Sequence, residues 1–142
     1  MNPARTQVLV VDDSQPIRNN IVRLLRGMGF DAVDEAADGD DALTLFRRKP
    51  YDVVITDWQM PRVSGLELLH AIRHSGERSE TPVLLLTGDA TAARGKEAID
   101  AGANGFLAKP FRVTEFCAKM LRVVSSLAPV TSLGAPRDLP LS

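Results

Sequence analysis

The sequence predicts an α/β fold in which helices cover both faces of an open parallel sheet. Short apolar runs recur along the chain, and amphipathic stretches of helical length separate them. Such runs are typical of parallel strands buried on both faces, and the stretches between them are typical of crossover helices. A polar residue directly follows four of these runs. For example, Asp12 follows Val8–Val11, and Thr87 follows Val83–Leu86.

The first two strand-and-helix pairs have clear boundaries in the sequence. A strand is predicted over 7–11, and Ser14 caps an amphipathic helix that ends at Gly29. The second strand, over 32–36, is rich in alanine and flanked by acids, which suits the edge of a sheet. A second helix is predicted over 38–48.

The remaining elements continue the same alternation. A strand over 52–56 precedes a helix capped by Ser64, and the polar stretch 75–81 is expected to be a loop. The helix over 91–101 is the least regular, because Gly95 inside it costs roughly 1 kcal/mol relative to alanine. Local instability of this kind suits an element that moves. The other expected elements are strands over 83–86 and 105–108 and a helix over 112–127.

The sequence also predicts where the domain ends and which residues of two helices face the core. Residues 128–142 contain three prolines and no periodic pattern, so we expect one domain over 1–127 and a disordered C-terminal tail over 128–142. The helix after Ser64 is expected to bury Leu66, Leu69 and Ile72. The last helix is expected to bury Val113, Phe116, Met120, Val123 and Leu127.

Polar residues that follow the strands are expected to form one site. Asp12 and Asp13 follow the first strand, Asp57 the third, Thr87 the fourth and Lys109 the fifth. In open parallel sheets, ligands bind beyond the carboxyl ends of the strands, at the point where the strand order reverses. Three acids, one hydroxyl and one ammonium group should therefore converge there.

Carboxylates gathered in this way require a counter-charge. At ~4 Å, each pair of like charges costs about 4 kcal/mol at an effective dielectric of 20. Protonation of one acid relieves the repulsion, and so does binding of a hard cation. Oxygen ligands without histidine or cysteine favour Mg²⁺, which also bridges to phosphate oxygens. Lysine and threonine donors suit a phosphoryl group, and an aspartate can itself attack phosphorus.

Four motifs in order resemble a known family, the receiver domain of two-component response regulators. They are Val10-Val11-Asp12-Asp13-Ser14, Asp57-Trp58-Gln59-Met60-Pro61 with Gly65, Leu86-Thr87-Gly88, and Lys109-Pro110-Phe111. The resemblance covers roughly residues 6–127 and is greatest to the single-domain chemotaxis regulators of the CheY type. It implies a doubly wound, flavodoxin-like (βα)5 fold with strand order 2-1-3-4-5, and a cis bond before Pro110.

The resemblance also implies how the site works. Asp57 would accept a phosphoryl group from a histidine kinase or a His-phosphotransfer protein. Asp13, Asp57 and the backbone carbonyl of Gln59 would bind Mg²⁺ directly, and Asp12 would act largely through water. Lys109 would pair with Asp57 before phosphorylation and with the phosphoryl group afterwards.

A change of conformation would carry the signal to a protein target. Thr87 would move toward the phosphoryl oxygens, and the Phe106 ring would turn inward, which alters the surface formed by residues 91–101, 105–108 and 112–127. Phe106 stands where motor-binding chemotaxis regulators commonly carry tyrosine. Gln59 and Asp89 would flank the path of the water that attacks the phosphoryl group, so the dephosphorylation rate stays open.

The predicted function is a signalling switch that catalyses only its own phosphoryl transfer and dephosphorylation. A second hypothesis is a Mg²⁺-dependent phosphatase of the haloacid-dehalogenase kind, but the Asp-x-Asp signature of that family is missing at Asp12-Asp13. A third is a pseudo-receiver without phosphorylation, against which the acids and Lys109 argue. The output also stays open between motility control, a phosphorelay, a phosphate sink and a receiver from a larger regulator.

Composition limits the location and the other partners. A net charge of −1 argues against nucleic-acid binding, and no apolar run is long enough for a membrane span. One cysteine, Cys117, and no signal peptide favour the reducing cytoplasm. A monomer or a weak dimer is expected.

Two further residue types have alternative interpretations. Trp58 either reports on the acid pocket or only covers it. His70 and His74 have the spacing of a metal pair, but a solvated helix face is the preferred interpretation because a third ligand is missing.

Overall fold

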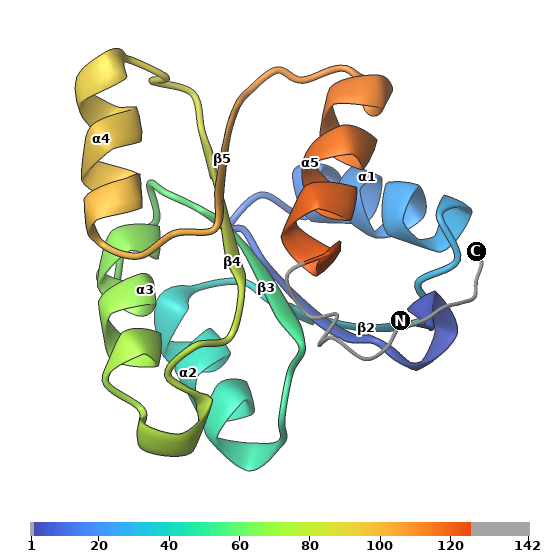
Figure 1. The fold of residues 1–142 in the computed structure, drawn as a ribbon, viewed down its shortest axis with the longest axis horizontal. Helices are drawn as coiled ribbons and strands as arrows, with labels where there is room; N and C mark the ends of the chain where they lie inside the picture. Colours follow the sequence, from blue (N-terminus) through green and yellow to red (C-terminus); the bar gives the residue numbers. More distant parts are fainter. Residues whose placement is uncertain (1, 126–142) are drawn as a thin grey trace.

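The computed structural model describes residues 2–125, which form a five-stranded parallel sheet with helices on both faces. The strand order is β2-β1-β3-β4-β5. Helices α1 and α5 cover one face, and α2, α3 and α4 cover the other (Figure 1). The elements are β1 (Gln7–Val11), α1 (Gln15–Gly27), β2 (Ala32–Ala36), α2 (Gly39–Arg48), β3 (Val53–Asp57), α3 (Gly65–Arg73), β4 (Val83–Thr87), α4 (Ala92–Asp100), β5 (Gly105–Ala108) and α5 (Val113–Ser125), with short 3-10 helices at Pro3–Arg5 and Gly76–Arg78.

This architecture confirms the predicted fold class and strand order. Capping explains several of the helix starts: the Ser14 hydroxyl accepts from the Ile17 amide, and Ser64 forms a reciprocal capping box with Glu67. Helix α4 lies inside the predicted range, with Thr91 as its cap. Strand β3 is shifted by one residue from the prediction, because the Asp57 backbone still pairs with Leu86. The expected loop over 75–81 contains a 3-10 turn.

Two apolar layers sandwich the sheet, one under each set of helices. Alternate strand residues point to opposite faces, so Val8 and Val10 join one layer and Leu9 and Val11 the other. The layer under α1 and α5 contains Ile21, Leu25, Phe30, Phe116, Met120, Val123 and Val124. The layer under α2, α3 and α4 contains Ala42, Phe46, Trp58, Leu68, Leu69, Ile72 and Ala98.

The predicted core residues of two helices need correction. Val113 is 58% exposed, although it lies on the predicted inward face of α5. Helical periodicity sets the direction of a side chain, but burial also requires a neighbouring element, and within residues 2–125 none covers this first residue of the helix. In α3, Leu66 is only partly buried, while Leu68 is fully buried. Leu127 and the predicted tail over 128–142 lie outside the described residues.

Within residues 2–125, none of the helices combines the length and the apolar character that crossing a membrane requires.

Candidate functional site

Strand register brings the predicted site residues to one edge of the sheet. Val11 pairs with Thr56, so Asp12 and Asp57 come next on adjacent strands. Thr87 pairs with Ala108, so Lys109 follows at the same edge. Strands β1 and β3 are neighbours although β2 lies between them in the sequence, which makes their carboxyl ends the switch point of the fold.

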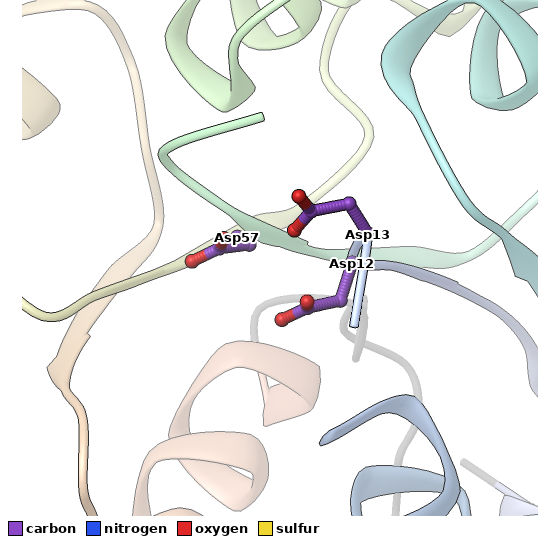
Figure 2. Close-up of side chains that lie close together, drawn as sticks. All are labelled: Asp12, Asp13 and Asp57. Atoms are coloured by element: carbon purple, nitrogen blue, oxygen red, sulfur yellow. The ribbon is translucent and has the colours of Figure 1, made fainter. Parts of the chain in front are cut away.

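Three carboxylates meet at this switch point. Asp12, Asp13 and Asp57 each offer an oxygen, and these oxygens all lie within 4.8 Å of one another. Figure 2 shows the three side chains gathered where β1 and β3 end. Asp12 and Asp57 are buried, at 1% and 5% exposure, while Asp13 reaches solvent. The cluster therefore combines two buried carboxylates with one that solvent reaches.

The two carboxylate oxygens of Asp12 differ in their hydrogen bonding. Its Oδ1 accepts a hydrogen bond of 2.8 Å from the backbone amide of Ser14, which orients the carboxylate. Its Oδ2 is buried and has no hydrogen-bond partner within the described part of the chain. The nearest cation is the Lys109 ammonium, 3.6 Å away. Because a buried acceptor without a partner is costly, this atom points to a ligand or an ordered water.

Asp57 and Lys109 form the ion pair of the site. Lys109 Nζ lies 2.9 Å from Asp57 Oδ1. Burial is the main cause that raises the pKa of Asp57; the Lys109 hydrogen bond opposes this shift, and the negative charge of Asp12 adds to it. Burial alone would lower the pKa of Lys109, but the hydrogen bond and attraction to Asp57 raise it above its ordinary value. The pKa of each group is therefore raised, for Asp57 chiefly by burial and for Lys109 by its acidic neighbours.

The donor set suits a hard metal ion. The clustered ligands are carboxylate oxygens, with neither histidine nor cysteine among them. The unsatisfied Asp12 Oδ2 and the excess negative charge are two independent reasons for a cation to bind there. The acid pocket therefore fits the predicted metal site.

The loop after β3 is packed tightly against the end of that strand. The Gly65 amide donates a 2.8 Å hydrogen bond to the Trp58 carbonyl. A Cβ at Gly65 would lie only 2.2 Å from the Asp57 carbonyl oxygen, so only glycine allows this approach. The predicted cis bond between Lys109 and Pro110 is present on the other side of the site.

Thr87 and Phe106 are the two residues of the predicted switch. Thr87 is buried, and its hydroxyl accepts a 3.0 Å hydrogen bond from the Asp89 amide. Phe106 is partly buried and meets Trp58 edge to face, with ring centroids 6.1 Å apart. The movements predicted for these two residues stay predictions, because one conformation does not test them.

The Trp58 side chain is buried in the apolar layer under α2, α3 and α4 and is only 3% exposed. The Trp58 ring also contacts Arg94, a residue that the sequence analysis did not identify. The Arg94 guanidinium lies 4.8 Å from the ring centroid. Arg94 Nε lies 3.6 Å from Asp89 Oδ2 as well. Local sequence patterns cannot predict a contact between two residues that are far apart in the chain. An open groove of about 490 Å³ beside this contact is lined by Trp58, Gln59, Met60, Pro61, Ser64 and Arg94.

Within residues 2–125, the two histidines are not part of the cluster that could hold a metal ion. His70 and His74 are both exposed. His74 Nδ1 donates to the His70 carbonyl at 2.7 Å, which engages one ring nitrogen within the helix. The preferred interpretation of a solvated helix face is thus confirmed for the described residues.

Comparisons with known proteins agree with this geometry. The family model of the response regulator receiver domain matches residues 8–121. The chain is 37% identical over 121 residues to the chemotaxis protein CheY-3 of Vibrio cholerae, which covers 85% of this chain and 93% of that protein. It is 40% identical over 105 residues to the chemotaxis protein CheY of Pseudomonas aeruginosa, covering 74% and 85% of the two chains.

Solved structures share the fold. The chemotaxis response regulator CheY4 of Vibrio cholerae superposes with a TM-score of 0.78 at 36% identity, over 83% of this chain and 98% of that one. The receiver domain of the Francisella response regulator 1452 superposes with a TM-score of 0.79 at 30% identity, over 87% and 99%.

Proposed function

This chain belongs to the response regulator receiver family of two-component systems, and on that premise we propose that Asp57 is its phosphoryl acceptor. One observation carries the assignment: Asp57 is buried in an acid cluster and held 2.9 Å from the Lys109 ammonium. Lys109 Nζ lies nearer to Asp57 Oδ1 than to Asp12 Oδ2, which is 3.6 Å away. The chain is a signalling switch rather than a metabolic enzyme.

The metal that we propose for the pocket is Mg²⁺. Asp13, Asp57 and the backbone carbonyl of Gln59 would hold it, and Asp12, whose Oδ2 accepts no hydrogen bond within residues 2–125, would act largely through water. When bound, Mg²⁺ supplies positive charge that offsets the repulsion of the acids and of the incoming phosphoryl oxygens. The Ser14 amide orients the Asp12 carboxylate for this role.

The proposed transfer forms one bond and breaks one bond. An Asp57 carboxylate oxygen attacks the phosphorus of a phosphohistidine, an O–P bond forms and the N–P bond breaks. The imidazole leaves with the bonding electron pair and takes a proton from solvent. Lys109 then moves its ammonium hydrogen bond from the Asp57 carboxylate to a phosphoryl oxygen.

The switch that we propose follows from this new charge. Thr87 turns its hydroxyl toward the phosphoryl oxygens, and the Phe106 ring turns into the space left behind, which alters the surface of α4, β5 and α5. A groove of about 340 Å³ between α4, β5 and α5 is lined by Phe106 together with Ile99, Lys119 and Arg122. A protein target would bind at this surface, and Gln59 and Asp89 would set how fast water removes the phosphoryl group.

The phosphodonor that we propose is a histidine kinase or a His-phosphotransfer protein, and the compartment is the cytoplasm, which keeps Cys117 a thiol. A chemotaxis or motility output is favoured by the similarity to two CheY proteins. A phosphorelay, a phosphate sink and a receiver that acts within a larger regulator are the other outputs, and a monomer or weak dimer suits each.

Labelling of the full chain with acetyl phosphate tests the assignment. We expect Mg²⁺-dependent labelling that hydroxylamine reverses and that Asp57→Asn abolishes, while Asp31→Asn, in an exposed loop, labels like the wild type. Normal labelling of Asp57→Asn would remove the assignment. Sustained turnover of p-nitrophenyl phosphate would instead support a phosphatase.

A further inference from the structure

Arg94 holds two segments beside the site together. The residue lies in the first turn of α4, and its side chain is only 31% exposed. Its guanidinium lies 4.8 Å from the centroid of the Trp58 ring, in the loop after β3. Its Nε also lies 3.6 Å from Asp89 Oδ2, in the loop after β4. A side chain with these two partners has a defined position.

Both the side chain and the backbone of Asp89 have partners as a result. Its carboxylate faces Arg94, and its backbone amide donates a 3.0 Å hydrogen bond to Thr87 Oγ1. Trp58, Arg94, Asp89 and Thr87 therefore form a continuous chain of contacts from the loop after β3 to the buried hydroxyl at the end of β4.

This chain of contacts opposes a movement of Thr87. If Thr87 moves toward Asp57 and keeps its bond to the Asp89 amide, Asp89 must follow and leave Arg94, which Trp58 holds in place. If Asp89 stays with Arg94 instead, the hydrogen bond between its amide and the Thr87 hydroxyl breaks. Either route loses one contact, so the contacts of Arg94 favour the conformation in which the site carries no phosphoryl group.

We propose that Arg94 is a positioning residue that stabilises the resting conformation of residues 87–91 and thereby weakens binding of a phosphoryl group at Asp57. The inference rests on the proposed function, because it requires Thr87 to approach a phosphoryl oxygen. A ligand shifts such an equilibrium only by its differential affinity for the two conformations, and Arg94 adds to the difference that the phosphoryl group must overcome.

The size of the effect follows from the contact that is lost. Arg94 keeps its contact with Trp58 in both conformations, so the contact at stake is its partly exposed ion pair with Asp89. Loss of such an ion pair in the active conformation changes an apparent affinity by roughly twofold to fivefold. Removal of a positive charge near an anion site would by itself weaken anion binding. Tighter binding after loss of Arg94 would therefore identify the positional effect, because charge acts in the opposite direction.

Calorimetric titration of the full chain with beryllofluoride in Mg²⁺, a stable mimic of the phosphoryl group, tests the proposal. We expect Arg94→Ala to bind the mimic roughly twofold to fivefold more tightly than the wild type. Arg94→Lys, which keeps the charge but not the planar group, should fall between them. Hydrogen exchange at the Asp89 amide should become faster in Arg94→Ala, and circular dichroism checks that each variant is folded.

A second background separates positioning from general loosening of the fold. In Thr87→Ala, the Arg94→Ala change should alter the affinity by less than about twofold, because the hydroxyl that Arg94 restrains is gone. Equal or weaker binding by Arg94→Ala alone would overturn the inference, and so would the same tightening in the Thr87→Ala background. If the wild type itself does not bind beryllofluoride, the proposed function fails together with the inference.

Discussion

Replacement of Asp13 by asparagine tests the central physical feature of the site, the mutual repulsion of its acids. The oxygens of Asp12, Asp13 and Asp57 lie within 4.8 Å of one another. At that distance each pair of charges repels by about 1 kcal/mol at the dielectric of water and by about 3.5 kcal/mol at an effective dielectric of 20. Asp13 is exposed and so lies nearer the first value, with two charged neighbours.

We therefore expect Asp13→Asn to raise the free energy of unfolding by about 1–2 kcal/mol in the absence of divalent ions. For a domain of this size, each 1 kcal/mol corresponds to a rise in Tm of about 4 °C. Millimolar Mg²⁺ should reverse the order, because a cation that binds only the folded state stabilises it by mass action and the variant has lost one ligand.

Urea unfolding of both proteins, with and without Mg²⁺, measures the two effects. Asp31→Asn is the matched control, because Asp31 precedes β2 at the opposite end of the strands and is exposed. The reasoning would be refuted if Asp13→Asn were no more stable than the wild type without metal while the control was unchanged. Equal stabilisation of wild type and variant by Mg²⁺ would show that Asp13 is not a ligand.

Three further substitutions test other parts of the argument. Gly95→Ala should stabilise the protein by about 1 kcal/mol in urea unfolding, because its Cβ would lie at an ordinary 3.6 Å from the Phe106 ring; lower stability would show strain in α4. Gly65→Ala should lower stability by about 1–3 kcal/mol and weaken Mg²⁺ binding, because its Cβ would collide with the Asp57 carbonyl; unchanged calorimetric binding would contradict this. Hydrogen bonds from Lys49 and Tyr51 lower the pKa of Asp34 from its ordinary value of 3.8. The wild type should therefore be more stable than Asp34→Asn in urea unfolding above pH 3.8, and this difference in stability should shrink as the pH falls below that value. A difference that is constant with pH would refute the role of these hydrogen bonds.

The sequence alone determined the alternation of elements and the residues of the acid site. Strand ends are local features, because an apolar run that stops at an acid or a lysine is visible without any contact. In a parallel sheet the ends of all strands lie at one edge, so four local features predict one site. The sequence therefore sufficed to place Asp12, Asp13, Asp57 and Lys109 together.

Tertiary structure alone decided which side chains are covered and which polar atoms are left over. Periodicity put Val113 on the inward face of α5, but no element of the described part of the chain covers it, and it is 58% exposed. Within residues 2–125, the lack of a hydrogen bond to the Oδ2 of Asp12 and the stacking of Arg94 on Trp58 also depend on residues distant in the chain. Sequence patterns record the direction in which a side chain points, whereas burial and partnership depend on what the fold brings opposite it.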